Sequence, residues 1–164
     1  MILAGVIFLY INNPFGHKKD LNKLEIINEC IRCDLKDIDF SRKDLSELNF
    51  YLTNFSGANL TDTNLSKSYL SLTDLSGANL SGADLSSANL SGANLSSANL
   101  SSANLSNANL TFTDLSRTNF NGANLSGAHF DGAVLSEANF NGANLSGAHF
   151  DKTKNNQVHK HFHF

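Results

Sequence analysis

A chain of 164 residues with 41% hydrophobic and 16% charged residues has the size and composition of one folded domain with a continuous core, and not of a disordered segment. Its formal net charge is only -3, so it has no excess of Lys and Arg with which to neutralise many phosphates. The composition therefore argues against direct binding of nucleic acid.

The chain begins with an apolar segment, residues 1–12, that is too short to span a bilayer as a helix. The sequence from Met1 to Ile11 resembles the core of a signal peptide, yet no basic residues precede it and no clear Ala-x-Ala cleavage site follows. The alternative is a strand that caps the fold. Both interpretations stay open, and no integral membrane span is expected.

Residues 13–32 are predicted to form a short helical cap. Asp20 can accept hydrogen bonds from the first turn of a helix that runs to about Glu29. Apolar residues at three-residue spacing would let this helix cover the end of the structure that follows, which would otherwise expose unpaired backbone groups. These residues are Leu21, Leu24 and Ile27.

The next segment, residues 33–152, has a five-residue period. From Leu35 to Phe150 every fifth residue is Leu or Phe, in 24 consecutive units without an exception, and a small residue stands two positions earlier in most units. Residues five apart lie about 140° apart around an α-helix and on opposite faces of a strand, so neither element gathers the Leu and Phe on one side. A coil that turns a corner in every unit points both positions inward.

A duplication gives the length of one turn of this coil, which we call a lap. The twelve residues from Phe120 to Asp131 recur letter for letter from Phe140 to Asp151, a spacing of 20 residues or four units. About six laps of about 4.8 Å each predict a rod roughly 29 Å long, in which side chains 20 residues apart stack. The predicted core includes Leu60, Leu80, Leu100, Phe120, Phe130, Phe140, Phe150, Ala78 and Ala98. An exposed ladder on one side is predicted at Asn59, Asn79, Asn99, Asn119 and Asn139.

The recurring Ala-Asn-Leu-Ser-Gly sequence resembles the pentapeptide-repeat family over about three quarters of the chain. The resemblance implies an all-β solenoid, a right-handed quadrilateral β-helix with the Leu or Phe and the preceding small residue inside. The early units depart from the pattern, as is typical of terminal repeats. Lys43 stands at a small inward position, so we expect the first lap to be distorted there to let the ammonium group reach solvent.

The only two cysteines, Cys30 and Cys33, precede the regular repeats. The sequence Cys30-Ile-Arg-Cys33-Asp-Leu resembles the junction between helix and first lap in exported or lumenal pentapeptide-repeat proteins of cyanobacterial type, which favours a periplasmic, lumenal or secreted location over a cytoplasmic one. No second ligand pair lies near for zinc, and a redox Cys-x-x-Cys belongs at a helix start. A local disulfide and two inert thiols remain the alternatives.

The last residues, 153–164, are predicted to form a flexible tail. Its alternating histidines would project to one side of an extended chain, where they could bind a metal ion, but a frayed polar tail is the preferred interpretation. They are His159, His161 and His163.

Two sets of titratable residues stand at outward positions of the repeats. His129 and His149 should stack about 5 Å apart, and Asp34, Asp74 and Asp114 lie on one side at intervals of about 10 Å. The histidines have no third ligand nearby, and the acids are too far apart to act as a catalytic pair. A filled rod also has no interior pocket, so no enzymatic activity, cofactor or metal is expected.

The predicted function is a non-catalytic structural or protein-interaction module whose flat polar sides contact a protein partner. The alternative is a DNA mimic that binds a type II topoisomerase (DNA gyrase), as one branch of the resembled family does. From Asp34 to Phe150 the chain has 11 acidic and 5 basic residues, fewer acids than such a mimic needs, and it shows no C-terminal dimerisation element. Ice binding would require a ladder of Thr, but Ser follows most of the Leu residues.

The sequences Asn-Leu-Ser and Asn-Leu-Thr, acceptor sites for N-glycosylation, recur along the repeats. A eukaryotic secretory route would therefore place glycans over the Asn ladders. A bacterial origin is favoured.

Overall fold

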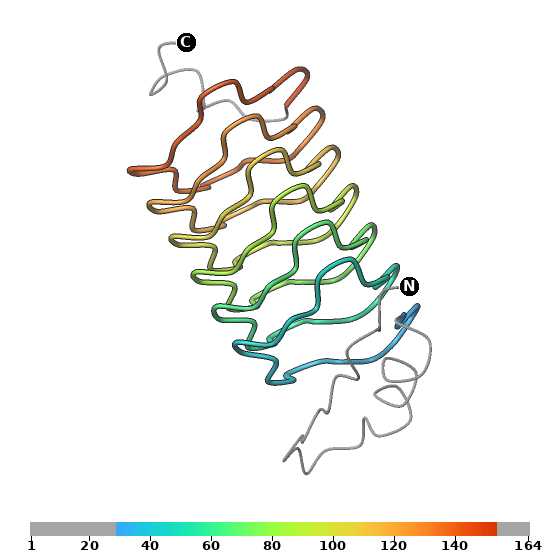
Figure 1. Cartoon of the computed structure of the whole chain (residues 1–164). Coiled ribbons are helices and arrows are strands. Elements are labelled where there is room, and N and C mark those ends of the chain that lie inside the picture. Colours follow the sequence, from blue (N-terminus) through green and yellow to red (C-terminus); the bar gives the residue numbers. More distant parts are fainter. Residues whose placement is uncertain (1–28, 154–164) are drawn as a thin grey trace, which may run out of the picture.

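The structure is a computed structural model, which describes residues 29–153, and it is a rod of stacked laps (Figure 1). The described residues contain neither a helix nor an extended strand. Instead, single residues pair in parallel β-bridges at every fifth position from Glu29 to His149. Every bridge joins residues 20 apart, such as Asn59 with Asn79 and Asn79 with Asn99. The chain is therefore a β-helix with a lap of 20 residues, the spacing that the duplication predicts.

Three predicted segments lie outside the described residues: the apolar segment 1–12, residues 13–28 of the helical cap, and the tail from residue 154 onward. Between residues 29 and 153, no helix has the length and apolar character needed to cross a membrane.

In a typical five-residue unit, every backbone N–H group is hydrogen-bonded. Three donate to carbonyl groups of the neighbouring laps, one closes the corner within the chain, and one is accepted by an Asn or Asp side chain. In one unit the bonds are Leu80 N to Asn99 O (2.7 Å), Gly82 N to Ser101 O (2.9 Å), Asn79 N to Ala58 O (2.9 Å), Ala78 N to Leu75 O (3.1 Å) and Ser81 N to Asn79 Oδ1 (3.2 Å). Because buried backbone groups must be paired, this pattern explains why Asn or Asp precedes the Leu so often.

The predicted core residues all point into the rod. Leu60, Leu80 and Leu100 are fully buried, and Phe150, in the last described lap, is partly buried. Aromatic rings stack directly between laps: the ring centroids of Phe130 and Phe150 lie 4.6 Å apart with nearly parallel planes. Stacking of this kind follows from identical residues at 20-residue spacing.

Hydroxyl side chains at small inward positions do not leave polar atoms unpaired. Thr63 Oγ1 donates to Phe40 O at 2.8 Å, and Ser68 Oγ donates to Leu65 O at 2.7 Å. Among the described residues, every buried side-chain nitrogen or oxygen has a hydrogen-bond partner. Thr and Ser can therefore replace Ala inside the rod without an orphaned donor.

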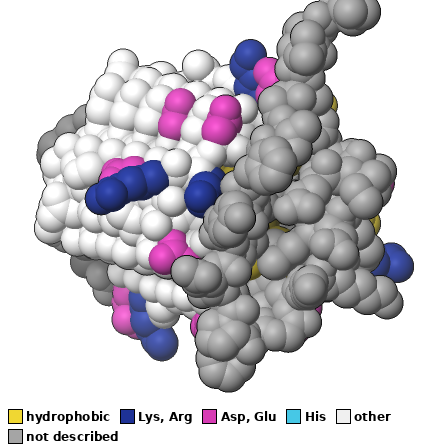
Figure 2. Space-filling view, turned by 60° about the horizontal axis from the view of Figure 1, so that its bottom comes forward, with side chains coloured by type: hydrophobic (Ala, Val, Ile, Leu, Met, Phe, Trp, Pro, Cys, Tyr) yellow, Lys and Arg dark blue, Asp and Glu magenta, His cyan; other side chains and the backbone are white. Residues whose placement is uncertain are grey.

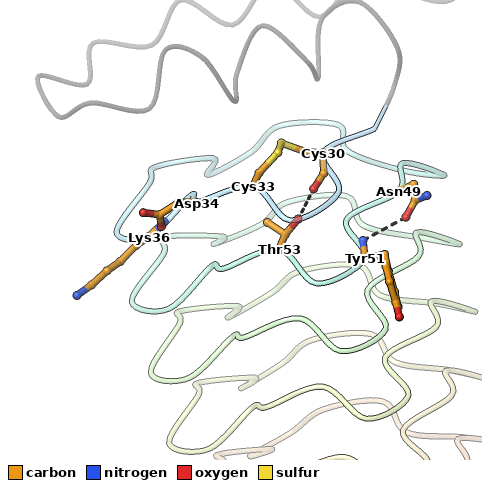
Figure 3. Close-up of a disulfide and its surroundings, with 7 residues drawn as sticks. All are labelled: Cys30, Cys33, Asp34, Lys36, Asn49, Tyr51 and Thr53. Atoms are coloured by element: carbon orange, nitrogen blue, oxygen red, sulfur yellow. Dashed lines mark hydrogen bonds between the residues drawn. A yellow bond between two sulfur atoms is a disulfide. The ribbon is translucent and has the colours of Figure 1, made fainter.

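The coil begins four residues earlier than the predicted boundary at residue 33. Glu29 already pairs with Asn49, so residues 29–32 belong to the first lap and not to the predicted helical cap. Cys30 takes the large inward position and Cys33 the next small one, and their sulfur atoms form a disulfide (Figure 3). The hydroxyl of Thr53 in the second lap donates to the carbonyl oxygen of Cys30.

The predicted distortion at Lys43 is wrong. Its N–H donates to Phe40 O at 3.1 Å and its carbonyl oxygen accepts Asn64 N at 2.9 Å, which are the bonds made at other small inward positions. Lys43 is half-buried. A long side chain can pack its methylene groups against apolar neighbours and keep its ammonium group in water, so the backbone need not move.

Every corner contains one residue in the left-handed region of backbone conformation. From Arg32 to Lys152, every fifth residue has φ between 55° and 72°. Glycine fills only some of these positions, and residues as large as Leu72 and Phe112 fill others. Because L side chains disfavour this region, the bonds between laps must hold the corners in place.

Candidate functional site

The outer surface of the rod carries isolated charged groups on a mostly uncharged polar background (Figure 2). Each unit offers three outward positions: the Asn or Asp before the Leu, the Ser after it, and the corner residue with positive φ. Residues 20 apart share one position along the rod, so the surface is best compared column by column.

The predicted ladder of five Asn lies on one side of the rod. In the upper part of this ladder, the side-chain Nδ2 of each Asn donates to Oδ1 of the Asn one lap earlier. These bonds run from Asn99 to Asn79 (3.2 Å), from Asn119 to Asn99 (3.1 Å) and from Asn139 to Asn119 (3.3 Å). Asn59 instead donates to Asp39, and its Oδ1 accepts the hydroxyl of Thr61 at 2.8 Å. The five Asn pair without a break through their backbones, but within the described structure no hydrogen bond joins the side chains of Asn79 and Asn59.

The ladder serves the fold, because each Oδ1 also accepts the N–H two residues later. Asn99 Oδ1, for example, accepts Ser101 N at 3.2 Å. The amide nitrogen donates to the neighbouring lap, and the amide oxygen accepts a backbone N–H of its own lap. These amide groups are therefore poorly available to a partner.

The acidic column consists of Asp34, Asp74 and Asp114, which alternate with Asn54 and Asn94 along one side. Asp74 Oδ1 accepts Asn94 Nδ2 at 3.2 Å and Ser76 N at 3.0 Å. The acids are two laps apart, as predicted, and do not pair with one another.

His129 and His149 stack, with ring centroids 4.7 Å apart and planes 3° from parallel. Throughout the described residues, no group of three or more His, Cys, Asp and Glu is arranged to hold a metal ion. The pair is therefore a continuation of the stacked columns at the end of the rod.

Three ion pairs join corners of neighbouring laps. They are Arg42 Nε with Asp62 (4.0 Å), Lys67 Nζ with Glu47 (3.6 Å) and Arg117 Nε with Glu137 (3.4 Å). All six side chains are largely exposed, so each pair adds at most about 1 kcal/mol. Their effect is to neutralise these corners.

Asp39, in the first described lap, has a lowered pKa. Donation by Ser41 N at 2.9 Å lowers the pKa of its carboxyl group below 3.8, and the Ser41 hydroxyl, Asn59 and Lys43 act in the same direction. The group lies almost entirely in solvent, which suits a turn-stabilising role and not acid–base chemistry.

One surface feature was missed by the sequence analysis. Large apolar side chains gather at and beside one corner of the lap. We call this group the apolar corner; it consists of Tyr51, Leu52, Tyr69, Leu72 and Phe112. Backbone hydrogen bonds between neighbouring laps place the corner residues in one column. Examples are the bonds from Leu52 N to Ser71 O (3.2 Å) and from Leu72 N to Ser91 O (3.0 Å). Tyr51 lies outside the coil (Figure 3). The signal in the sequence is Leu52, Leu72 and Phe112 at multiples of 20.

Comparison with solved structures finds several pentapeptide repeat proteins. One from the cyanobacterium Cyanothece 51142 is 30% identical, with 82% of this chain and 95% of that chain covered and a TM-score of 0.40. One from the Arabidopsis thaliana thylakoid lumen is 32% identical, with coverages of 73% and 72% and a TM-score of 0.48. QnrB1, a plasmid-mediated fluoroquinolone resistance protein, is 24% identical, with coverages of 75% and 72% and a TM-score of 0.53.

No curated protein matches the chain significantly. The family model "Pentapeptide repeats" matches in eight copies, over residues 29–66, 53–92, 73–111, 83–122 and 113–154. These matches extend over the whole described coil. The chain therefore belongs to the pentapeptide-repeat family.

Proposed function

We propose that the chain is a non-catalytic structural and protein-interaction module: a right-handed, four-sided rod of about six laps with an N-terminal helical cap, whose outer surface contacts a protein partner. It needs no cofactor or metal for this role. The cysteines serve as a covalent clasp at the start of the coil.

The observation that supports this proposal is that the inner positions form the core, whereas the outer positions face solvent. Apolar side chains, chiefly Leu, Phe and Ala, fill most of the inside of the described laps, and most backbone N–H groups are used between or within laps. Only outward side chains are left to offer specific chemistry. They vary from lap to lap, whereas the large inner position is Leu or Phe in every unit from Leu35 to Phe150.

The Cys30–Cys33 disulfide supports an oxidising compartment, periplasmic, lumenal or secreted. Disulfides of this kind rarely persist in a reducing cytosol. The proposal is checked by thiol labelling of the protein taken directly from its host: protection of both cysteines agrees with it, and free thiols contradict it.

The interaction role is tested by capture from host extract with the full-length chain immobilised. Triple Lys variants mark the sides one at a time, for example Ser86→Lys, Ser106→Lys and Ser126→Lys together. We expect a protein partner in stoichiometric amount, lost with the variant of one side and kept with the others. Absence of any such partner overturns the proposal.

A second candidate is inhibition or protection of a type II topoisomerase by DNA mimicry, favoured by the excess of 11 acids over 5 bases from Asp34 to Phe150. The acids are sparse beyond Ser76, with four acids and one base up to Phe150. The assay is supercoiling by purified gyrase with the protein added at micromolar concentration. An unchanged supercoiling rate removes this candidate.

A further inference from the structure

The large side chains of the apolar corner lie outside the core of the rod. Phe112 is 76% exposed and Leu72 is 48% exposed, and both have the left-handed backbone that bulky side chains disfavour. At two of the other corners, Ser87 and Ser102 hold the equivalent position of the unit with φ of 56° and 58°. A small polar residue would therefore serve the corner better, and a cluster of exposed apolar side chains is typical of an interaction surface.

Two glycines make the apolar corner continuous along the rod. A Cβ atom at Gly92 would lie 2.7 Å from Leu72 Cδ2, and one at Gly132 would lie 2.6 Å from Phe112 Cδ1. The Leu and Phe side chains thus lie flat along the corner, over the glycine of the next lap. Apolar atoms cover this corner from Leu52 as far as Gly132.

The other three corners are polar. They carry the ion pairs Arg42–Asp62, Lys67–Glu47 and Arg117–Glu137, together with Ser, Asn, Asp and Gly. The apolar corner is thus specific to one direction around the rod.

Uncompensated acids flank the apolar corner. Asp74 and Asp114 follow Leu72 and Phe112 by two residues, so they lie just around the corner at the same levels, and Asp131 lies on its other side. Among the described residues, neither Asp74 nor Asp114 forms an ion pair. Residues 49–54, 69–74, 89–94, 109–114 and 129–134, which form this surface in five laps, include no Lys or Arg. The cations of this corner column, Arg32 and Lys152, stand one lap beyond Leu52 and Gly132, and each is two laps from the nearer of Leu72 and Phe112.

The spacing of these groups matches an α-helix. Rings 20 residues apart are separated by 4.6 to 5.0 Å, so the Leu72–Asp74 and Phe112–Asp114 levels, two laps apart, are separated by about 10 Å. Seven residues of an α-helix advance by about 10.5 Å. A helix lying along the rod would therefore bring equivalent heptad positions to both levels.

We propose that the apolar corner binds a cationic amphipathic α-helix of a partner protein. Its apolar stripe lies on Leu72 and Phe112, and its Lys or Arg residues lie beside Asp74 and Asp114. This inference rests on the proposed interaction function and narrows it, because it places the contact on a corner and not on the flat polar sides.

The test uses the full-length protein and a synthetic helix of about three heptads, with Leu at the a and d positions and Lys elsewhere. Binding is measured by fluorescence anisotropy of the labelled peptide. We expect saturable binding that weakens with added salt. The double variant Leu72→Ser with Phe112→Ser should weaken it by about tenfold or more, since it removes the apolar anchors. The thermal midpoint should stay the same or rise, because Ser87, Ser97 and Ser102 show that Ser accepts the same backbone conformation at the other corners.

The acidic flank is tested with a closely matched control. Asp74→Asn removes a charge beside the apolar corner, and Asp84→Asn removes one on another side. Both carboxylates make the same contacts: Asp84 accepts Ser86 N at 2.9 Å and Asn104 Nδ2 at 3.0 Å, as Asp74 accepts Ser76 N and Asn94 Nδ2. We expect Asp74→Asn to weaken binding and Asp84→Asn to leave it unchanged, and adding Asp114→Asn to Asp74→Asn should bring the loss to about threefold to tenfold.

Three outcomes would overturn the inference. If the Leu72→Ser and Phe112→Ser double variant binds the peptide as well as the wild type, the helix docks elsewhere, and the broader interaction role stands. If a Leu–Glu helix binds as well as the Leu–Lys helix, or Asp84→Asn weakens binding as much as Asp74→Asn, the acidic flank does not select the partner. If neither helix binds, the apolar corner is not a helix site, whereas the interaction role is decided separately by the capture experiment.

Discussion

Leu100 and Ser102 stand two residues apart in one lap and face opposite constraints. Leu100 is fully buried, and its column contains only Leu and Phe from Phe40 to Phe140. Ser102 lies at an exposed corner whose column includes Arg42 and Asp62 as well as glycine. The difference teaches that the shape of the rod depends on the inner positions, so the outer positions can change without loss of the fold.

The largest effect that tests this contrast is a charge placed inside. Leu95→Lys buries an ammonium group without a partner in mid-rod and should cost on the order of 5 kcal/mol or more, or prevent folding. Circular dichroism and thermal unfolding measure it. Ser102→Lys is the control, because Lys67 and Lys152 already stand at corners with φ of 57° and 55°. Similar losses in the two variants would contradict the contrast.

A smaller inner change should still exceed most outer changes. Leu100→Ala leaves a cavity between two neighbouring laps and should reduce the free energy of unfolding by about 2–5 kcal/mol. Urea denaturation gives the value, and Leu100→Met, which keeps the volume, should cost less than about 1.5 kcal/mol. A loss below that of Leu100→Met would show that the laps collapse around a deleted side chain.

Removal of one amide from the Asn ladder should have an intermediate effect. Asn99→Ala removes the bond to Asn79 and the acceptor for Ser101 N and Asn119 Nδ2, and should cost about 1–2 kcal/mol. Asn99→Asp keeps the acceptor and should recover part of this loss, as Asp84 does in its own lap. Thermal unfolding of the two variants against the wild type decides; equal losses would mean that the acceptor has no role.

The smallest expected effect is the pH dependence of Asp39. Its folded pKa is lowered, so its ionised form contributes stability above the ordinary Asp pKa of about 3.9, and this is lost as pH falls through the folded value. Asp39→Asn should therefore be less stable than the wild type at about pH 6, and the difference should shrink as the pH falls below the ordinary Asp pKa of about 3.9. A stability difference that does not change between these pH values would contradict it. Solvent screening keeps the effect below that of Asn99→Ala.

Much of the interior could be predicted from the sequence because a five-residue period leaves few geometries. The Leu and Phe positions and the duplication at Phe120 and Phe140 together indicate the lap length. The start of the coil was misplaced because Cys30 is neither Leu nor Phe, although the disulfide lets it fill the same inward position. The distortion expected at Lys43 did not occur because a long side chain can reach solvent past a regular backbone.

The candidate site was harder to predict. Left-handed backbone at Leu72 and Phe112 runs against the preference of these residues and is imposed by bonds between laps. The apolar corner becomes visible only when residues are compared in columns of 20, since Leu52, Leu72 and Phe112 are isolated within their own units. The sequence suggests, in contrast, that the Asn side chains are exposed and free to bind a partner, but in the structure their Oδ1 atoms accept backbone N–H groups of the turn.

The 20-residue lap has a consequence for how such rods can diverge. Insertion of one five-residue unit would move every later outward group to the adjacent side, whereas insertion of four units would keep its direction and raise it by about 4.8 Å. Insertions or deletions of whole units can therefore change the side on which a binding group lies, or its position along the rod, while the inner Leu and Phe positions keep their pattern.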